Sequence, residues 1–346
     1  MIKVLVVDDS AVARAFLVEL LGSDPAIRVV GTAADGMEAV EAVEKLRPDL
    51  VTMDIHMPRM DGQEAIREIM QTRPTPIVVV TGNEITEEVR ATFASLELGA
   101  LALVPRPAGP RHPEHAALSR QLVETVKLMS EVKVVRRWNR QPARVVRAAG
   151  ATAGRTRRVR VVAIGASTGG PTVLKDILAA LPRTFTVPVA IVQHIAPGFV
   201  DGFAAWLAEG TGRPVRVARG GEDLVAGGVY VAPDGQHLGF DLNGRVGLER
   251  GEAAGGLCPS VTHLFKSTAR VFGADAAGVL LTGMGRDGAD GLLALRRAGA
   301  VTIAQDAESC VVNGMPGEAV RLGAADHVLS PEKIAEMLSG LSPVAE

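Results

Sequence analysis

The stretch that decides the fold runs from Val159 to Leu178 and reads Val-Arg-Val-Val-Ala-Ile-Gly-Ala-Ser-Thr-Gly-Gly-Pro-Thr-Val-Leu-Lys-Asp-Ile-Leu. An apolar run ends at Ile164, a glycine-rich segment follows, and Pro171 opens a stretch whose apolar residues recur every three or four positions. Proline suits the first turn of a helix because its missing N–H would have no intrahelical partner there. The apolar spacing is that of a helix with one buried face. The stretch therefore predicts a strand, a tight turn that holds Ser167, and a helix.

Three glycine-turn chemistries compete for this turn. A dinucleotide-binding turn requires glycine at the position of Ser167, and a phosphate-binding P-loop requires lysine at the position of Pro171, so both fail by one residue. The segment Gly165 to Gly169 does match G-x-S-x-G, a pattern that exposes a serine hydroxyl beside backbone N–H donors. Because the chain has 38 glycines, a serine that only caps the following helix is the alternative until a base and an acid are found.

The composition indicates a soluble, globular protein that is long enough for two domains. Of its 346 residues, 47% are hydrophobic and 22% charged, and no apolar run approaches the roughly 18 residues of a membrane span. The N-terminus enters a strand pattern without the basic and small-residue segments of a secretory signal, so we expect a cytoplasmic protein. Cys258 and Cys310 have apolar neighbours and are expected to be buried thiols rather than metal ligands or a disulfide framework.

Charge is unevenly distributed along the chain, although the formal net charge is only −2. Residues 134–158 contain eight arginines and no acidic residue, together with Pro142, Gly150 and Gly154 but no sustained periodicity. We interpret this segment as an interdomain linker. The alternative is that this segment is a nucleic-acid-binding arm. Because Trp138 is its only aromatic residue, we do not expect a nucleic-acid partner.

Residues 1 to about 107 alternate five times between short apolar runs and helical patterns, which indicates a parallel sheet with helices on both faces. The apolar runs are Ile2 to Val7, Ile27 to Val30, Leu50 to Met53, Ile77 to Val80 and Ala100 to Val104. A further helical pattern spans Glu114 to Val132. Polar residues follow the runs at their C-terminal ends, where open α/β sheets place their sites.

Acidic residues end two of these runs. Asp8 and Asp9 follow the first run, Asp54 follows the third, and Thr81 ends the fourth. Carboxylates at neighbouring strand ends repel one another unless a cation joins them, and Mg²⁺ is the natural partner because it prefers a few carboxylates with water and phosphate oxygens. With the metal in place, one carboxylate can act as a nucleophile toward a phosphoryl group. The pattern therefore predicts a Mg²⁺-dependent phosphorylation site.

This half of the chain resembles a response-regulator receiver domain. The resemblance lies in Val7-Asp8-Asp9-Ser10, in the ten residues from Met53 to Gly62 and in the strand-end Thr81. It implies a flavodoxin-like sheet of five parallel strands, with Asp54 as the phosphoacceptor and a sensor histidine kinase as the phosphodonor. It also implies Mg²⁺ ligands at Asp8, Asp9, Asp54 and the backbone carbonyl of His56, and a Thr81 hydroxyl that follows the phosphoryl group.

One residue departs from the receiver pattern. Receivers carry a lysine before a proline at the end of the fifth strand, where this chain has Arg106 before Pro107. Arginine keeps the positive charge but replaces a compact ammonium group with a wide, planar guanidinium. The difference bears on both the phosphorylation rate and the switch that follows it.

The alternation of strands and helices resumes after the linker. The expected strands are Val187 to Val192, Val215 to Ala218, Val229 to Ala232, His237 to Phe240, Val246 to Leu248, Ala277 to Leu281 and Val301 to Ala304, and the expected helices are Pro197 to Glu209, Pro259 to Phe272 and Asp290 to Ala298. The pair Asn243-Gly244 between two alternating segments predicts a hairpin. The second half is therefore expected to be a doubly wound, mostly parallel α/β domain with an antiparallel hairpin insert.

A nucleophilic serine needs a histidine within hydrogen-bond reach and an acid that orients this histidine. Of the seven histidines, His194 alone ends a buried strand and enters a Pro-Gly loop, which places it on the same sheet edge as Ser167. The same test selects Asp287 as the acid, with Asp306 as the second choice. Glycines around Met284 would let backbone N–H groups approach a substrate oxyanion. Together these residues indicate acyl transfer through a serine.

The order Ser, His, Asp differs from that of α/β-hydrolases, in which the acid precedes the histidine. It matches the chemotaxis protein-glutamate methylesterases, the CheB family, which residues 159 to 340 resemble. The matching motifs are Gly165 to Pro171, Gln193 to Phe199, Tyr230 to Pro233, Pro259 to Val261, Leu281 to Gly288 and Ser309 to Pro316. The resemblance implies Ser167 as nucleophile, His194 as general base, Asp287 as its orienting acid and the Met284 N–H as an oxyanion donor. Thr262 stands where the family often has an acid, which bears on substrate contacts.

We therefore expect a receiver domain with its last helix at 1–133, an arginine-rich linker at 134–158 and a methylesterase domain at 159–346. The expected function is phosphorylation-activated hydrolysis of glutamate γ-methyl esters on the signalling helices of chemoreceptors, with release of methanol. Deamidation of receptor glutamines uses the same chemistry. The esterase itself is expected to need no cofactor, and the protein is not expected to insert into a membrane.

Two other functions fit the same sequence. The esterase could serve a signalling array unrelated to chemotaxis, or the protein could be a regulator that works by binding while its second domain is catalytically idle. In the favoured scheme the receiver covers the edge that holds Ser167 until Asp54 is phosphorylated, and then shifts away as a population shift between two domain arrangements.

Overall fold

The computed structural model describes residues 1–82, 86–109, 111–132, 134, 158–251 and 257–343. The chain divides into two compact units, Met1–Arg144 and Val145–Glu346. Most of the expected arginine-rich linker, residues 135–157, lies outside the described residues. None of the described helices is both long and apolar enough to cross a membrane.

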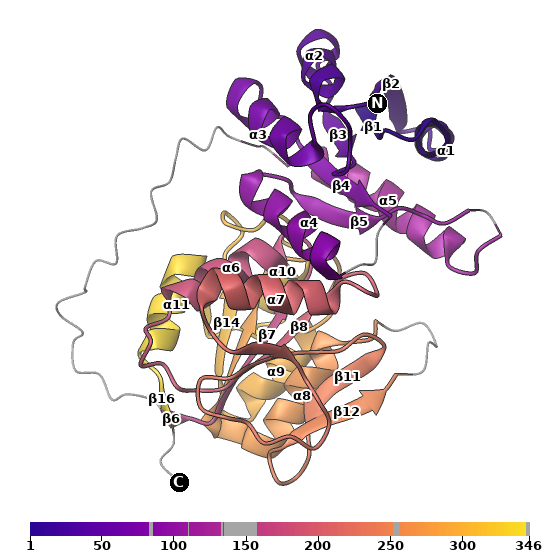
Figure 1. Ribbon diagram of the computed structural model, residues 1–346. Coiled ribbons are helices and arrows are strands. Elements are labelled where there is room, and N and C mark those ends of the chain that lie inside the picture. The colour runs from indigo at the N-terminus through magenta and orange to yellow at the C-terminus, as the bar shows by residue number, and fades with distance from the viewer. Residues whose placement is uncertain (83–85, 110, 133, 135–157, 252–256, 344–346) are drawn as a thin grey trace. The chain divides into compact units, whose positions relative to one another are not determined.

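The N-terminal unit is built on a sheet of five parallel strands in the order β2-β1-β3-β4-β5 (Figure 1). The strands are β1 (Ile2–Val7), β2 (Ile27–Ala33), β3 (Leu50–Met53), β4 (Ile77–Thr81) and β5 (Ala102–Pro105). The helices are α1 (Ala11–Gly22), α2 (Gly36–Leu46), α3 (Gly62–Thr72), α4 (Thr86–Leu98) and α5 (His115–Met129). Helix α3 contacts α2 and α4, whereas Phe16 of α1 meets the ring of His115 of α5 at 5.9 Å. The expected receiver-type sheet is confirmed.

The C-terminal unit contains a parallel sheet of seven strands in the order β15-β14-β13-β7-β8-β10-β9. These strands are β7 (Val161–Ala166), β8 (Val189–Gln193), β9 (Val215–Val217), β10 (Val229–Val231), β13 (Ala276–Leu280), β14 (Val301–Gln305) and β15 (His327–Leu329). The helices are α6 (Gly170–Ala180), α7 (Val200–Thr211), α8 (Val261–Phe272), the short 3₁₀ helix η1 (Gly273–Asp275), α9 (Ala289–Arg297), α10 (Met315–Arg321) and α11 (Pro331–Ser339). Two short strands, β6 (Arg158–Val159) and β16 (Ser342–Pro343), pair with each other.

The helices of this unit contact one another in two groups. Helix α6 packs with α7 and α11, while α9 packs with α8 and α10. The antiparallel hairpin of β11 (Gln236–Phe240) and β12 (Val246–Arg250) packs on α8. The hairpin turns at Gly244, whose φ of +80° favours glycine. This is the expected doubly wound domain with an antiparallel insert.

Two features of the second unit differ from the expectations. Helices α10 and α11 were not anticipated, because their short apolar patterns follow glycine- and proline-rich segments. The two thiols were expected to be buried, which is wrong: Cys258 and Cys310 are both partly exposed. Their apolar sequence neighbours therefore do not report their own burial.

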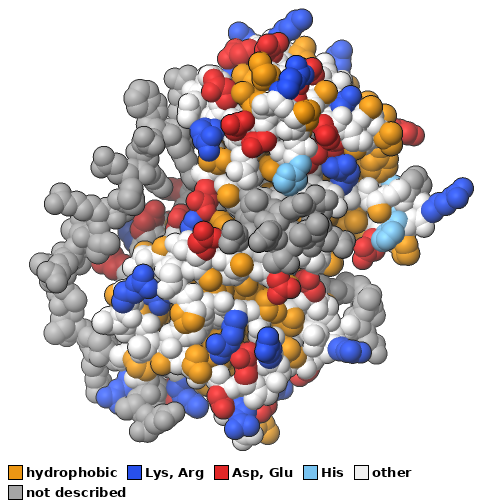
Figure 2. All heavy atoms as spheres, in the orientation of Figure 1, with side chains coloured by type: hydrophobic (Ala, Val, Ile, Leu, Met, Phe, Trp, Pro, Cys, Tyr) orange, Lys and Arg blue, Asp and Glu red, His pale blue; other side chains and the backbone are white. Residues whose placement is uncertain are grey.

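The surface agrees with the small net charge of the chain. On the face drawn in Figure 2, acidic and basic side chains of the described residues are interspersed.

Candidate active site

Ser167 lies in the turn between β7 and α6, and backbone contacts fix it on both sides. Its N–H donates to the Thr282 carbonyl at 3.0 Å, and its carbonyl accepts from the Gly170 N–H at 2.8 Å. The side chain of Gln193 also donates to this carbonyl, at 2.8 Å. Helix α6 takes Gly169 as its N-cap and has no side-chain cap. The alternative reading of Ser167 as a helix cap is therefore wrong, and its hydroxyl makes no hydrogen bond within the part of the chain that the structure describes.

Glycines let the chain pass close to Ser167. Gly169 has a φ of +78°, a conformation that side chains rarely adopt. A Cβ added at Gly283 would lie 2.6 Å from the Cβ of Ser167. The second glycine therefore allows the loop after β13 to approach the serine at a distance that any side chain would prevent.

His194 follows β8 and lies on the same sheet edge as Ser167. Its N–H donates to the carbonyl of Ala166, the last residue of β7, at 2.9 Å. Its ring nitrogen Nε2 lies 3.0 Å from Asp287 Oδ2. Among the described residues, no hydrogen bond joins the imidazole to Ser167 Oγ; such bonds are commonly long without substrate and tighten when it binds. The imidazole is thus oriented by the acid and has Nδ1 left for other partners.

Asp287 is held at the first turn of α8. Its Oδ1 accepts from Ser260 Oγ at 3.0 Å, the Thr262 N–H at 3.0 Å and the Gly288 N–H at 2.9 Å. Its Oδ2 accepts from the Val261 N–H at 2.7 Å besides His194. Burial raises the pKa of Asp287, but the hydrogen bonds from His194 and Thr262 outweigh it and hold the pKa well below its usual range. Asp287 therefore stays ionised, and the proton between the two residues belongs to His194 Nε2.

Asp306, the second choice for the acid, belongs to a different turn. It follows β14, and its Oδ1 accepts from the N–H of Ser309 at 2.9 Å and from its Oγ at 2.6 Å. The structure brings Asp287, and not Asp306, to His194.

Met284 lies in the glycine-rich loop after β13. The neighbouring Gly283 donates its N–H to the Val312 carbonyl at 3.0 Å, and Gly285 has a φ of +81°. In the part of the chain that the structure describes, the Met284 N–H has no acceptor, and the residue is 37% exposed. This N–H is therefore available to an oxygen from outside the chain.

Three further residues support this edge and were not singled out from the sequence. Gln193 holds the Ser167 carbonyl, Thr282 Oγ1 donates to the Thr168 carbonyl at 3.0 Å, and Ser260 donates to Asp287. The sequence contains a pattern that indicates two of them, because Gln193 and Thr282 are polar residues at the ends of buried strands. Ser260 precedes an apolar helical pattern, as N-caps do.

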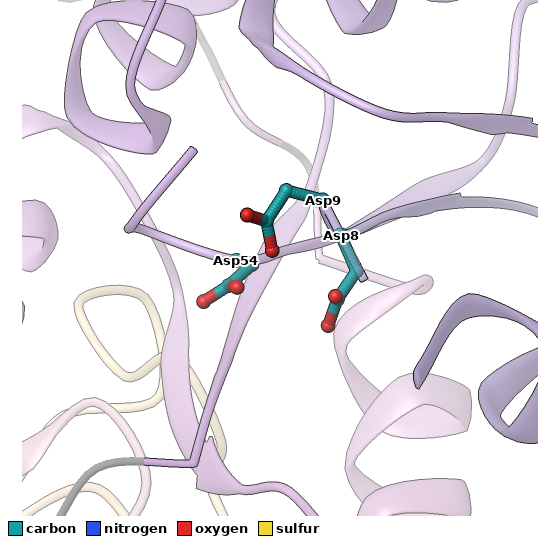
Figure 3. A group of neighbouring side chains, drawn as sticks. All are labelled: Asp8, Asp9 and Asp54. Carbon is teal, nitrogen blue, oxygen red and sulfur yellow. The ribbon is translucent and has the colours of Figure 1, made fainter. Parts of the chain in front are cut away.

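In the N-terminal unit, three carboxylates meet at the ends of β1 and β3. One oxygen from each of Asp8, Asp9 and Asp54 lies within 4.8 Å of the others (Figure 3). Asp8 is fully buried, and its Oδ2 has no hydrogen-bond donor among the described residues. A buried carboxylate oxygen that lacks a hydrogen-bond donor and lies beside two further carboxylates fits a hard divalent cation such as Mg²⁺.

Arg106 supplies positive charge to this acidic cluster. Its Nη2 lies 3.4 Å from both Asp8 Oδ2 and Asp54 Oδ2, and its side chain is 26% exposed. Burial and the charge of Asp8 nevertheless raise the pKa of Asp54 to about 6, since the charge of Arg106 offsets them only in part. One guanidinium therefore does not compensate the acidic cluster.

The other receiver residues lie near the acidic cluster. Thr81 is buried at the end of β4, and its carbonyl accepts from the Arg106 N–H at 2.7 Å. His56 is exposed two residues after Asp54, and a role for its carbonyl stays a prediction.

Comparison with known proteins agrees with this architecture. The CheB methylesterase family profile matches residues 162–338, and that of the response regulator receiver domain matches residues 4–116. A protein-glutamate methylesterase/protein-glutamine glutaminase of Geobacter metallireducens is 54% identical over 99% of both chains. One of Nitrosospira multiformis is 52% identical over 99% of this chain and 97% of its own. The Thermotoga maritima CheB methylesterase catalytic domain is 38% identical and superposes with a TM-score of 0.50, covering 52% of this chain and 97% of its own.

Proposed function

The chain belongs to the CheB methylesterase family and carries a response regulator receiver domain, and from this premise we propose that it hydrolyses glutamate γ-methyl esters on chemoreceptors. The names of its relatives pair this activity with glutamine deamidation, which we include. The observation that carries the proposal is the 3.0 Å contact between His194 and Asp287 beside the turn that holds Ser167.

The proposed reaction passes through an acyl-serine. Ser167 Oγ attacks the ester carbonyl carbon while His194 accepts the serine proton. Collapse of the tetrahedral intermediate expels methanol, which takes this proton, and leaves the glutamyl group esterified to Ser167. Water then attacks the acyl group, again through His194, and releases the glutamate carboxyl group and free Ser167. A glutamine side chain reacts in the same way and releases ammonia.

Each nitrogen of His194 has a separate task in the proposed scheme. Because Asp287 engages Nε2, Nδ1 is the nitrogen that takes the proton of Ser167. The Met284 N–H is proposed to stabilise the oxyanion, since preorganised backbone donors give the largest single contribution in acyl transfer.

The receiver domain is proposed to control this reaction through phosphorylation of Asp54 by a sensor histidine kinase. Asp8, Asp9 and Asp54 would hold Mg²⁺, with the His56 carbonyl as a further ligand, and the ion would neutralise charge on the incoming phosphoryl group. Thr81 and Arg106 are the residues proposed to respond to the modified Asp54.

The direct test is release of methanol from methylated chemoreceptors by the full chain, with and without Mg²⁺ and a small phosphodonor. We expect release in both conditions and a faster rate with the phosphodonor. Absence of methanol in both would favour the binding regulator with an idle second domain. Release from receptors of an unrelated array, but not from chemoreceptors, would favour the other alternative.

Asp54→Asn should abolish the stimulation by the phosphodonor, because the amide is no nucleophile toward phosphorus. In the unaltered chain we expect the phosphodonor to raise the rate of methanol release about tenfold or more, because phosphorylation would make a minor active state the dominant one. The matched control is Asp61→Asn, since Asp61 caps α3 and asparagine caps equally well. Stimulation that persists in Asp54→Asn would contradict the assignment.

Arg106→Gln should bind Mg²⁺ about tenfold more tightly than the unaltered chain in titration calorimetry. The reason is that the guanidinium lies 3.4 Å from two of the proposed ligands and competes with the ion for their charge. Arg106→Lys keeps the charge and is the matched control. Equal or weaker binding in Arg106→Gln would show that the guanidinium does not oppose the ion.

A further inference from the structure

His237 lies outside the proposed triad but contacts Ser260, which donates a hydrogen bond to Asp287. It belongs to β11 of the hairpin, and its Nδ1 accepts from the Ser260 N–H at 3.1 Å. A ring nitrogen that accepts a hydrogen bond carries no proton, so Nδ1 is the acceptor in this contact and Nε2 is the donor nitrogen of the ring.

Ser260 connects this imidazole to the acid. It is the N-cap of α8, and its Oγ donates to Asp287 Oδ1 at 3.0 Å while it accepts from the His263 N–H at 3.3 Å. The next two N–H groups of the chain, those of Val261 and Thr262, also donate to Asp287. The position of Asp287 therefore depends on the backbone at Ser260, and the N–H of Ser260 is in turn bound by His237.

Stacking holds His237 in this place. Its ring lies against that of His263, with centroids 4.8 Å apart and planes at 15°. His263 comes from the first turn of α8, and its Nε2 lies 3.9 Å from Glu249 of β12. The two rings thus join the hairpin to the first turn of α8 where that turn meets Asp287.

We propose that His237 is a positioning residue for ester hydrolysis: through the N–H of Ser260 it fixes the first turn of α8, and thereby the alignment of Asp287 with His194. This inference rests on the proposed function. It assigns a purpose to a histidine that touches none of Ser167, His194 and Met284 through a hydrogen bond among the described residues.

The test compares two substitutions of His237 in the full chain. His237→Leu removes the acceptor, whereas His237→Asn places an amide oxygen near the position of Nδ1. We expect kcat for methanol release to fall about tenfold in His237→Leu with little change in KM, since the N–H of Ser260 is left unpaired. His237→Asn should recover most of the loss. His327→Leu, which replaces an exposed histidine of β15, should match the unaltered chain.

A second readout separates this inference from the proposed function. The rate at which a fluorophosphonate, a general reagent for activated serines, labels Ser167 needs no receptor and is measured by mass spectrometry. Slower labelling in His237→Leu and recovery in His237→Asn support the positioning role even if receptors release no methanol. Unaltered rates in both variants would overturn it. So would equal losses in both that follow their thermal unfolding temperatures, because a role in folding alone gives no rescue by asparagine.

Discussion

Ser167→Ala is expected to lower kcat for methanol release by about 10⁵-fold or more, to the residual rate that binding and the oxyanion donor provide. The loss is large because the hydroxyl is the proposed nucleophile, and no other described side chain is placed to replace it in this scheme. The fold should be unaffected, since the backbone of Ser167, and not its hydroxyl, makes the contacts of the turn. We expect the free energy of unfolding to change by less than about 0.5 kcal/mol.

The matched control for this substitution is Ser339→Ala. Ser339 ends α11, and its Oγ donates to the Ala335 carbonyl at 2.7 Å, so the change deletes the same atom far along the chain from the turn. Methanol release by this variant should equal that of the unaltered chain. A Ser167→Ala protein that keeps more than a few per cent of the activity would rule out the acyl-serine.

The sequence was sufficient for the five-stranded sheet and for six of the seven strands of the second parallel sheet, although not for β15, β6 or β16. It also placed the candidate residues of each unit at a common sheet edge. Strands that are mostly buried on both faces read as mainly apolar runs, interrupted only by Lys3 in β1 and Thr52 in β3, and both strands have the predicted bounds. Carboxyl ends of parallel strands share one edge, so the positions of Ser167 and His194 after two strands predict that they lie together. The same rule brought Asp8, Asp9 and Asp54 into one cluster.

The supports of the site could not be predicted in this way, because they depend on contacts between distant segments. Asp287 is held by the first turn of α8, some 26 positions earlier in the chain. The sequence of neither segment predicts that the two are in contact. The nitrogen of His194 that faces the acid is likewise set by ring orientation, which periodicity does not encode. His237 alternates within a hairpin like a surface residue, and the role proposed for it depends on the packing of β11 on α8.

Arg106 shows the limit of a resemblance. The family pattern indicates that a cation belongs at this position, and the structure places one there. The guanidinium nevertheless contacts two carboxylates at once, which a compact ammonium group is less suited to do. The proposed competition between Arg106 and Mg²⁺ therefore follows from the arginine of this chain and not from the family pattern, which has a lysine.

Asp287→Asn is expected to lower kcat by about 10⁴-fold, by analogy with the loss of the orienting acid in serine proteases. An amide can present its NH₂ group to His194 Nε2, which would force the ring to carry its proton on Nδ1 and leave no base for Ser167. The control is Asp306→Asn. In that turn the amide oxygen can still accept from Ser309, so we expect a change of less than about threefold. Loss of activity in Asp306→Asn alone would exchange the two assignments.

The same substitution should also change how stability depends on pH. The pKa of Asp287 lies below its unfolded value of about 3.9, so its contribution is complete above that pH and is lost as the pH falls through the folded pKa. Asp287→Asn should therefore lower the free energy of unfolding by about 2 kcal/mol at pH 7. This difference should shrink below pH 4. Urea unfolding of both proteins at pH 7 and pH 3 measures it, and an equal difference at both values would mean that the charge of Asp287 does not stabilise the first turn of α8.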